Sequence, residues 1–269
     1  MSDRVALVTG ASRGIGRATA LALAEAPFAV AVVARSRAAL EETRALVEES
    51  GVSATSAVAD VTDAEAVARA VEEIERDAGP ITVLVNNAGS LRAIGPLWET
   101  DPADWWSDVM TSLAGAYNCC RSVVPRMLAR GEGRIVNVTS YAGTRPAPNQ
   151  SGYGCAKAAL NSLTESLAAE LGEHGLTAFG VAAGFTRTEL TDHLTSAEGR
   201  RRLPDAGSGR VVDAEQTARL IAVLASGAAD ELSGRLLHTM DDVDALLEGI
   251  DEIRRDDLYV PRLRRLPGR

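Results

Sequence analysis

The sequence has few of the residues that build disulfide or metal sites. It contains three cysteines in 269 residues, Cys119, Cys120 and Cys155. Adjacent cysteines such as Cys119 and Cys120 rarely pair with each other, and no C-x-x-C spacing occurs. We therefore expect a reduced, cytoplasmic protein that holds no metal.

Long apolar runs and an excess of positive charge are also lacking. The longest nearly apolar stretch, residues 20–34, is interrupted by Glu25 and Pro27, so we expect neither an export signal nor a membrane-spanning helix. Lysine and arginine total 28 against 37 aspartates and glutamates, which gives a formal charge of −9. Because nucleic-acid binding depends chiefly on basic side chains, this balance argues against nucleic acid as the main partner.

Aromatic residues are scarce, at 4%, and short β-branched runs alternate with helical patterns along most of the chain. We expect strands near 4–10, 28–34, 53–58, 81–86, 134–140, 177–183 and 235–239, and helices near 14–26, 37–50, 63–78, 102–130, 152–173 and 213–227. Continuous apolar strands separated by helices indicate a parallel sheet covered on both faces. The predicted fold is α/β, a doubly wound Rossmann fold in a single domain with three α/β/α layers.

Two segments break this alternation. Residues 186–212 are polar and follow a strand at the end of the sheet where doubly wound proteins bind ligands, which predicts a substrate lid. The tail, residues 241–269, is acidic first and basic last, a pattern that fits either a solvated surface helix with a loose end or a partner-binding arm. We divide the chain into a dinucleotide-binding catalytic domain, residues 1–240, and a C-terminal extension, residues 241–269.

The first expected strand leads into a glycine-rich loop, TGASRGIG at residues 9–16. Glycine lets the backbone turn sharply and approach a pyrophosphate, whose charge then meets the amides of the following helix. The spacing G-x-x-x-G-x-G alone can be a tight turn, but its place between the first strand and the first helix favours dinucleotide binding. The candidate contacts are Gly10, Ser12, Arg13, Gly14, Ile15 and Gly16.

The end of the second strand bears on which dinucleotide binds. NAD sites usually place an acidic residue there, whereas this chain has Ala34 followed by Arg35 and Ser36. A guanidinium without a neighbouring carboxylate suits the 2′-phosphate of NADP(H), and Arg13 of the glycine loop supplies a second cation. NADP(H) is therefore favoured over NAD(H), unless both arginines are ordinary surface residues.

Two later strand ends point to the same pocket. Asp60 and Val61 follow the third strand, where a carboxylate can accept a hydrogen bond from the adenine amino group. Residues of the motif NNAG close the fourth strand, where the backbone meets the ribose; the candidates are Asn87, Ala88 and Gly89. Asx and glycine residues also form simple turns at strand ends, so each of these signals is weak when taken alone.

Tyr153 and Lys157 are four residues apart in the expected helix 152–173, which places their side chains on neighbouring turns. An ammonium close to a phenol favours the phenolate and so lowers the pKa of the phenol. Ser140, at the end of the fifth strand, precedes Tyr153 by 13 residues. Its hydroxyl can stabilise a developing oxyanion while the tyrosine supplies a proton, which is the chemistry that carbonyl reduction needs.

As a set, TGASRGIG, Asp60 with Val61, NNAG, Ser140 and YGCAK occur in an order and at separations that resemble the short-chain dehydrogenase/reductase (SDR) family, over residues 4 to about 240. The resemblance implies that Tyr153 is the general acid/base and that Ser140 orients the substrate carbonyl. It also implies that Lys157 lowers the pKa of Tyr153 and holds the nicotinamide ribose. The further cofactor contacts that it implies are Tyr153 itself, Gly184, Thr186 and Thr188.

Two positions depart from the family pattern. Ser112 aligns with an asparagine that, in the family, holds a helix distortion and, through its carbonyl, a proton-relaying water. A backbone carbonyl survives the exchange to serine, so we include Ser112 among the candidate catalytic residues; the alternative is an impaired proton supply or a different reaction. Ala183 replaces the family's proline before Gly184, which removes a rigid residue from that loop.

The leading hypothesis is an NADP(H)-dependent oxidoreductase that transfers a hydride between nicotinamide and a ketone or secondary alcohol, with a small-molecule substrate. An SDR-fold epimerase or dehydratase without net redox turnover is the enzymatic alternative. A catalytically silent NADP-binding regulatory protein is the non-enzymatic one. Pairing of the long helices 102–130 and 152–173 across a twofold axis, common in the family, implies a homodimer or a homotetramer.

Overall fold

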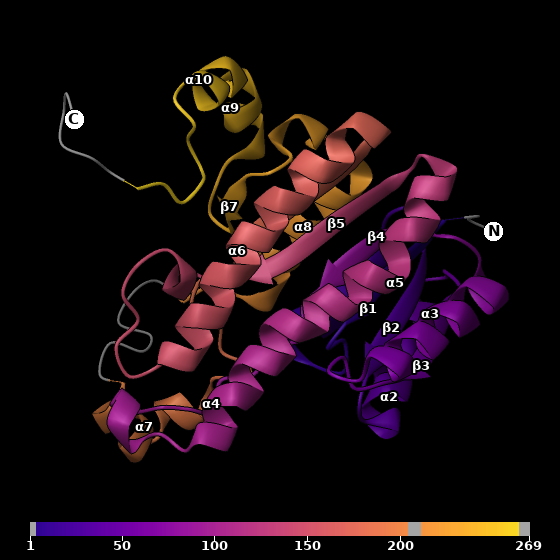
Figure 1. The fold of residues 1–269 in the computed structure, drawn as a ribbon. Helices are drawn as coiled ribbons and strands as arrows, with labels where there is room; N and C mark the ends of the chain where they lie inside the picture. Colours follow the sequence, from indigo (N-terminus) through magenta and orange to yellow (C-terminus); the bar gives the residue numbers. More distant parts are fainter. Residues whose placement is uncertain (1–3, 204–210, 264–269) are drawn as a thin grey trace.

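The computed structural model describes residues 4–203 and 211–263, in which a seven-stranded open sheet lies between two layers of helices (Figure 1). The strands are β1 (Val5–Thr9), β2 (Ala29–Ala34), β3 (Ala54–Val58), β4 (Ile81–Asn86), β5 (Gly133–Thr139), β6 (Leu176–Ala182) and β7 (Leu236–His238). Every neighbouring pair is parallel, in the order β3-β2-β1-β4-β5-β6-β7. The predicted α/β, doubly wound fold is confirmed.

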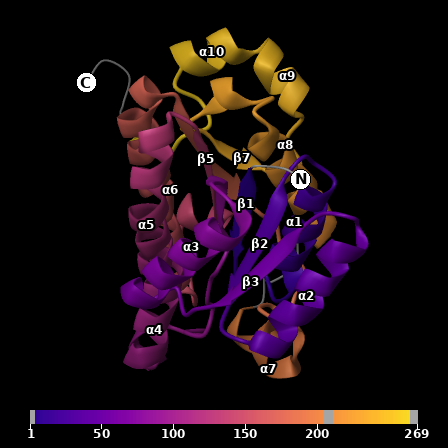
Figure 2. The same cartoon turned by 90° about the vertical axis from the view of Figure 1, so that its right-hand side faces the viewer.

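The two helical layers are well separated when the sheet is viewed from its side (Figure 2). One layer is α1 (Gly14–Ala24), α2 (Arg37–Glu49) and α8 (Ala214–Ser226); the other is α3 (Ala64–Ala78), α5 (Gly115–Arg130) and α6 (Ser151–Leu171). Successive side chains of a strand point to opposite faces, so Ala6 and Val8 of β1 join the first layer's core while Val5 and Leu7 join the second. No helix within the described ranges is long and apolar enough to cross a membrane.

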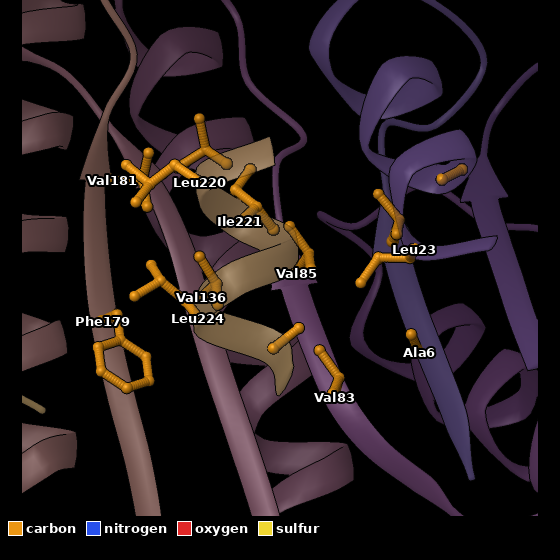
Figure 3. Packing of buried hydrophobic residues seen from close by; sticks show 14 of the residues in the cluster. Ala6, Leu23, Val83, Val85, Val136, Phe179, Val181, Leu220, Ile221 and Leu224 are labelled. Carbon is orange, nitrogen blue, oxygen red and sulfur yellow. The ribbon is translucent and has the colours of Figure 1, made fainter. Parts of the chain in front are cut away.

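Figure 3 shows how α8 packs on the sheet. Leu220, Ile221 and Leu224 lie on one side of this helix and contact the core that includes Val136 of β5 and Val181 of β6. Full burial of each such aliphatic side chain contributes about 1.5–3 kcal/mol to the free energy of unfolding. Because α8 begins directly after the expected lid, this packing fixes the C-terminal end of the lid to the sheet.

The expected helix 102–130 is interrupted in its middle. α4 (Pro102–Val109) is followed by a π-helical turn, Met110–Ala114, and α5 begins at Gly115. Ser112 is buried at the centre of this π turn. A π turn inserts one extra residue into a helix and commonly occurs at functional sites. The helix distortion implied by the family resemblance is therefore present around Ser112.

The described part of the C-terminal extension is folded onto the sheet. α9 (Val243–Glu248) and α10 (Ile250–Arg255) bury Leu246 and Ile253 in the same core as α8. The chain then follows the edge strand β7, where Leu236 N donates a hydrogen bond to Tyr259 O (2.8 Å). These residues form surface helices with mostly exposed side chains, anchored by two buried apolar residues and a strand edge, and a partner-binding role of the tail stays a prediction. Residues 264–269 lie outside the described residues.

Candidate active site

Many of the predicted cofactor contacts meet at the C-terminal ends of β1 and β4, where the strand order of the sheet reverses. A cavity of about 420 Å³ lies there. Its lining includes the predicted contacts Gly10, Ser12, Arg13, Gly14, Ile15, Arg35, Ser36, Asp60, Val61, Asn87, Ala88, Gly89 and Thr188. It also includes Ala34, Ala39, Ala59, Thr111, Glu189 and Leu190.

Two glycines allow the loops after β1 and β4 to touch. Gly10 has a φ of +64°, and a Cβ added to it would lie 2.9 Å from Ala88 Cα. A Cβ on Gly16 would lie 2.3 Å from the carbonyl oxygen of Gly10, closer than any side chain allows. The absence of a side chain at Gly16 therefore lets α1 pack directly against the backbone of Gly10. Gly16 itself is not part of the cavity lining.

Hydrogen bonds from the last residue of β1 fix the NNAG segment. Thr9 Oγ1 accepts from Asn87 N (3.0 Å) and from Ala88 N (3.1 Å). Asn87 Nδ2 donates in return to Thr9 O (2.9 Å). The Asn87 side chain thus holds the two loops together. Thr9 was not among the predicted residues, since a threonine inside a β-branched strand is indistinguishable from a core residue by pattern.

The helix N-termini at this cavity have no side-chain caps. Arg13 and Ser36 are the N-cap residues of α1 and α2, and neither side chain makes a capping hydrogen bond to a described residue. Neither helix has an acidic residue in its first turn. Unpaired amides without a nearby carboxylate are what an anion at a helix N-terminus requires. The residues present therefore fit the pyrophosphate of a dinucleotide at α1 and a further anion at α2.

The sequence suggested that Arg35 has no carboxylate neighbour, but in the structure it lies near Asp60. Its Nη1 lies 3.8 Å from Asp60 Oδ2, because β2 and β3 pair in register and bring their ends together. Asp60 Oδ1 accepts hydrogen bonds from Thr62 N (2.9 Å) and Thr62 Oγ1 (2.8 Å). Partial burial acts to raise the pKa of Asp60, but these hydrogen bonds and the Arg35 guanidinium together lower it.

Ser140, Tyr153 and Lys157 are gathered at the ends of β5 and α6. The Ser140 hydroxyl accepts a hydrogen bond from Ala142 N (3.2 Å) and lies close enough to Tyr153 to lower the pKa of its phenol. Lys157 Nζ lies 5.5 Å from the centre of the Tyr153 ring and donates to Val138 O (2.6 Å). The structure thus brings the three predicted catalytic residues into one group, with Lys157 fully enclosed by protein.

The pKa of Tyr153 is raised in this structure, whereas a lowering by Lys157 was expected. Burial is the main cause of the rise; the nearby Ser140 hydroxyl lowers the pKa of Tyr153 and the carboxylate of Asp108 raises it. Burial also lowers the pKa of Lys157 to about 8, so its positive charge is weakly held near neutral pH. Its ammonium is directed to the Val138 carbonyl, which explains why it has little effect on the phenol.

Ser112 faces the same group from the π turn. Its Oγ accepts a hydrogen bond from Ser90 N (3.4 Å). A Cβ added to Gly89 would lie 3.6 Å from Ser112 Oγ and 3.8 Å from Lys157 Nζ. Ser112 and Lys157 therefore lie against one backbone segment, the end of the NNAG motif, and Gly89 connects them to the cavity.

The described part of the segment expected to form a lid, residues 186–203 with 211 and 212, contains a short helix, α7 (Ala197–Arg202). Thr188, Glu189 and Leu190 of this segment line the cavity, and Leu194 and Leu203 belong to the apolar cluster on which Tyr153 packs. A Cβ added to Gly14 would lie 3.0 Å from Thr188 Cγ2, so the lid touches the glycine loop. Beside Tyr153, the buried side chains Leu91, Ile94, Leu194 and Leu203 form an apolar cluster with Phe185 and Leu190. Residues 204–210 of the expected lid lie outside the described residues.

The sequence profile of the family described as short chain dehydrogenase matches residues 4–199. The chain belongs to this family. The 3-oxoacyl-acyl-carrier-protein reductase FabG of Staphylococcus aureus is 37% identical over 236 residues, which cover 87% of this chain and 95% of that protein.

Solved structures of this family are similar over most of the chain. A variant of actinorhodin polyketide ketoreductase with NADPH has a TM-score of 0.80 at 30% identity, covering 88% of this chain and 95% of that one. An NAD⁺-bound xylitol dehydrogenase has a TM-score of 0.80 at 33% identity, covering 88% and 97%. The named relatives are reductases or dehydrogenases, and one of these two structures holds NADPH while the other holds NAD⁺.

Four of the contacts implied by the SDR resemblance, Tyr153, Lys157, Gly184 and Thr186, are not on the cavity wall. Gly184 lies against Val212, whose Cγ2 would be 2.6 Å from an added Cβ. Thr186 is buried and donates through Oγ1 to Gly184 O (3.1 Å). Ala183 N donates to Val181 O (3.1 Å), a bond that the family's proline cannot make, so a hydrogen bond replaces the proline ring as the restraint on this loop.

Sequence reasoning missed Asp108, a fully buried carboxylate in α4, and Thr111, which lines the cavity from the π turn. Asp108 lies four residues before Ser112 and therefore on the same side of the helix, which was the available signal. Among residues 4–203 and 211–263, no group of three or more His, Cys, Asp or Glu side chains is placed to hold a metal ion.

Proposed function

We propose that this protein is an NADP(H)-dependent oxidoreductase that interconverts a ketone and a secondary alcohol, with Tyr153 as the general acid/base. The observation that carries the proposal is the position of Lys157, whose Nζ lies 3.8 Å from where a Cβ on the cavity-lining Gly89 would be, so that the group of Ser140, Tyr153 and Lys157 adjoins the cavity. The reductases and dehydrogenases among the relatives support the same reaction class.

A nicotinamide cofactor bound in this cavity would supply the hydride in reduction and accept it in oxidation. The chain's own residues handle the oxygen and the proton. Ser140 donates a hydrogen bond to the substrate carbonyl oxygen, and Tyr153 gives that oxygen its hydroxyl proton as the alcohol forms. In the reverse direction the Tyr153 phenolate accepts the proton of the alcohol. Lys157 would hold the nicotinamide ribose, because its ammonium donates to Val138 O and is not among the groups that shift the pKa of Tyr153 in this structure. Ser112, which like Lys157 lies beside Gly89, is a candidate for the proton route to Lys157.

The surroundings of Tyr153 favour a substrate with apolar substituents. Leu91 and Ile94 from one loop and Leu194 and Leu203 from the lid are all buried next to the phenol ring. A polyhydroxylated substrate would leave hydroxyl groups without hydrogen-bond partners against these side chains, at a cost of about 1–3 kcal/mol for each group.

Arg35 and Ser36 support NADP(H) over NAD(H). The N-terminus of α2 has no side-chain cap, and the Arg35 side chain is 69% exposed beside it. A 2′-phosphate carries more charge than the Asp60 carboxylate and accepts two parallel hydrogen bonds from a guanidinium, so it competes well for Arg35. Arg13, at the N-terminus of α1, adds a second cation to the same cavity.

The helical face opposite the sheet supports a homo-oligomer. Trp106, Met110 and Tyr117 are exposed along α4, the π turn and α5, with 59%, 43% and 53% of their surface accessible. Three large apolar side chains in one row are unusual on a surface that stays in water. We include self-association through this row, as a dimer or as part of a tetramer, in the proposal.

The reaction is tested by mixing the purified protein with NADPH or NADH and a panel of aliphatic, aromatic and polyhydroxylated ketones while nicotinamide absorbance is followed. We expect NADPH to be consumed, fastest with apolar ketones. Product formed without a change in absorbance would instead indicate an epimerase or dehydratase. Tight NADPH binding with no ketone turned over would indicate a regulatory binding protein.

A further inference from the structure

Asp108 is a carboxylate with no exposed surface, near the end of α4. Its Oδ1 accepts hydrogen bonds from Ser90 Oγ (2.6 Å) and Arg92 N (2.8 Å), and its Oδ2 accepts from Arg92 N (3.1 Å) and Ala93 N (3.1 Å). A buried charge is costly unless its oxygens are paired in this way. One side chain therefore holds the whole loop segment 90–93 on the helix.

The held segment would otherwise have considerable freedom. Gly89 directly precedes the segment, and Gly95 lies two residues after it. Gly95 has a φ of +139°, and a Cβ added to it would have no described atom within 4 Å. Ser90 N also donates to Ser112 Oγ (3.4 Å), so a second contact comes from the π turn. Beyond the segment, Gly95 N donates to Asn149 O (2.8 Å), so the chain is anchored there, and the contacts with α4 and the π turn fix residues 90–93 themselves.

The same segment carries side chains of the apolar cluster. Leu91 lies within it and Ile94 directly follows it, and both are buried against Leu194 and Leu203 of the lid. Tyr153 packs on this cluster. A change in the position of residues 90–93 would therefore move apolar side chains beside the proposed acid/base without altering the dinucleotide cavity formed by the glycine loop.

We propose that Asp108 is a positioning residue of this active site, whose carboxylate fixes residues 90–93 on α4 and thereby sets where Leu91 and Ile94 meet the substrate. This inference rests on the proposed function, since it assigns those two side chains to the substrate side of the same site. Asp108 touches neither the cavity lining nor the reacting groups directly; it acts through the loop and through its charge.

The negative charge of Asp108 also affects the pKa of Tyr153, an effect that a purely structural role would not have. The polar and charged groups around Tyr153 are Lys157 of the same helix, Ser140 of β5 and Asp108 of α4, while the lid contributes Arg202, which donates to Ile94 O (3.2 Å). Burial raises the pKa of Tyr153 most, Ser140 lowers it and Asp108 raises it. Removing the Asp108 charge at constant size should therefore lower the pKa of Tyr153.

Three variants separate the loop from the charge. Asp108→Asn keeps the size of the side chain, removes its charge and places an NH₂ group opposite hydrogen-bond donors. Ser90→Ala removes one hydrogen bond and keeps the charge. Asp104→Asn is the control for loss of a carboxylate from the same helix, because Asp104 is half-buried and makes only a long ion pair, 3.9 Å, with the exposed Arg92 guanidinium.

For the full-length protein with NADPH and an apolar ketone, we expect KM to rise about tenfold in Asp108→Asn and about two- to fivefold in Ser90→Ala, with the Kd for NADPH changed less than about twofold. The pH profile of kcat for alcohol oxidation should move to lower pH in Asp108→Asn and stay in place in Ser90→Ala. The Asp104→Asn variant should match the wild type in all three measurements.

A wild-type KM in Asp108→Asn, or an unmoved pH profile in that variant, would overturn the inference. If Asp108→Asn does not fold, an unchanged KM in Ser90→Ala overturns it. The proposed function fails separately, because it requires that Tyr153→Phe be inactive whatever the Asp108 variants do.

Discussion

At the scale of single residues, Lys157 lies beside the proposed acid/base Tyr153, but its burial disfavours the charged ammonium. Its Nζ is next to Gly89 and close to the Tyr153 ring, and its hydrogen bond to Val138 O keeps it inside the protein. Burial lowers its pKa to about 8. The lysine is therefore poised to change charge in the pH range where reductases work, and its titration should be visible in stability.

Burial of Lys157 should make the stability of the cofactor-free protein depend on pH. Its pKa is about 8 when folded and 10.5 ordinarily, so between these values the unfolded chain binds more protons and the free energy of unfolding rises with pH. Below pH 8 the full cost, about 3 kcal/mol, is present. We expect urea unfolding to show the wild type gaining stability relative to Lys157→Met from neutral pH to about pH 10; a constant difference would contradict this.

Arg35 should select the phosphorylated cofactor. Losing a charge-assisted contact with the 2′-phosphate costs about 1.5–3 kcal/mol, so Arg35→Ala should weaken NADPH binding by about 10- to 100-fold and leave NADH binding unchanged. Arg37→Ala is the matched control, because Arg37 is an exposed arginine in the first turn of the same helix and does not line the cavity. Calorimetric Kd values for both cofactors measure this; equal losses for NADPH and NADH would refute the role of the 2′-phosphate.

At the scale of elements, the helices and strands could be predicted from local sequence patterns, whereas contacts between elements could not. The strands and the main helices follow from apolar runs and glycine positions, so β1 to β6 begin and end within about two residues of their predicted bounds. The Asp60–Arg35 approach could not be predicted, because it depends on the pairing of β2 with β3. Asp108 could not be assigned either, because its partners come from a loop more than ten residues away in sequence.

A methyl group added in the glycine loop should lower the free energy of unfolding where the loop is tightly packed. Gly16→Ala would place a Cβ 2.3 Å from Gly10 O, so we expect a loss of several kcal/mol in the free energy of unfolding and loss of NADPH binding. In Gly172→Ala, the added Cβ would have no described atom within 4 Å, and φ is −58°, so stability should be unchanged or gain about 0.4–1 kcal/mol. Urea unfolding of both variants tests this, and equal stability would contradict the close contact at Gly16.

At the scale of the whole molecule, the sheet places its two functional parts side by side. The cavity lies where the strand order reverses, and the apolar cluster lies beside it under the lid. The C-terminal extension completes the far edge by covering β7 and burying Leu246 and Ile253. Its packing could not be read from its charge blocks, because it depends on the apolar residues Val243, Leu246, Leu247, Ile250 and Ile253, which recur at helical spacing between those charges.

The exposed row on α4 and α5 should mediate self-association. Trp106→Asp places a charge in this row at its most exposed side chain, so we expect the oligomer seen by light scattering to dissociate. Leu46→Asp, at a partly exposed apolar position on α2, should keep the wild-type assembly. If Trp106→Asp has the same mass in solution as the wild type, the row is not an interface.

The central claim is that Tyr153 supplies the proton for reduction of a ketone. The most direct measurement is kcat for NADPH-dependent ketone reduction by Tyr153→Phe and by the wild type, with the Kd for NADPH determined on the same preparations. Loss of a general acid lowers kcat by about 10²- to 10⁴-fold, and we expect this fall with little change in Kd. A Tyr153→Phe protein that turns over ketone at the wild-type rate would contradict the account.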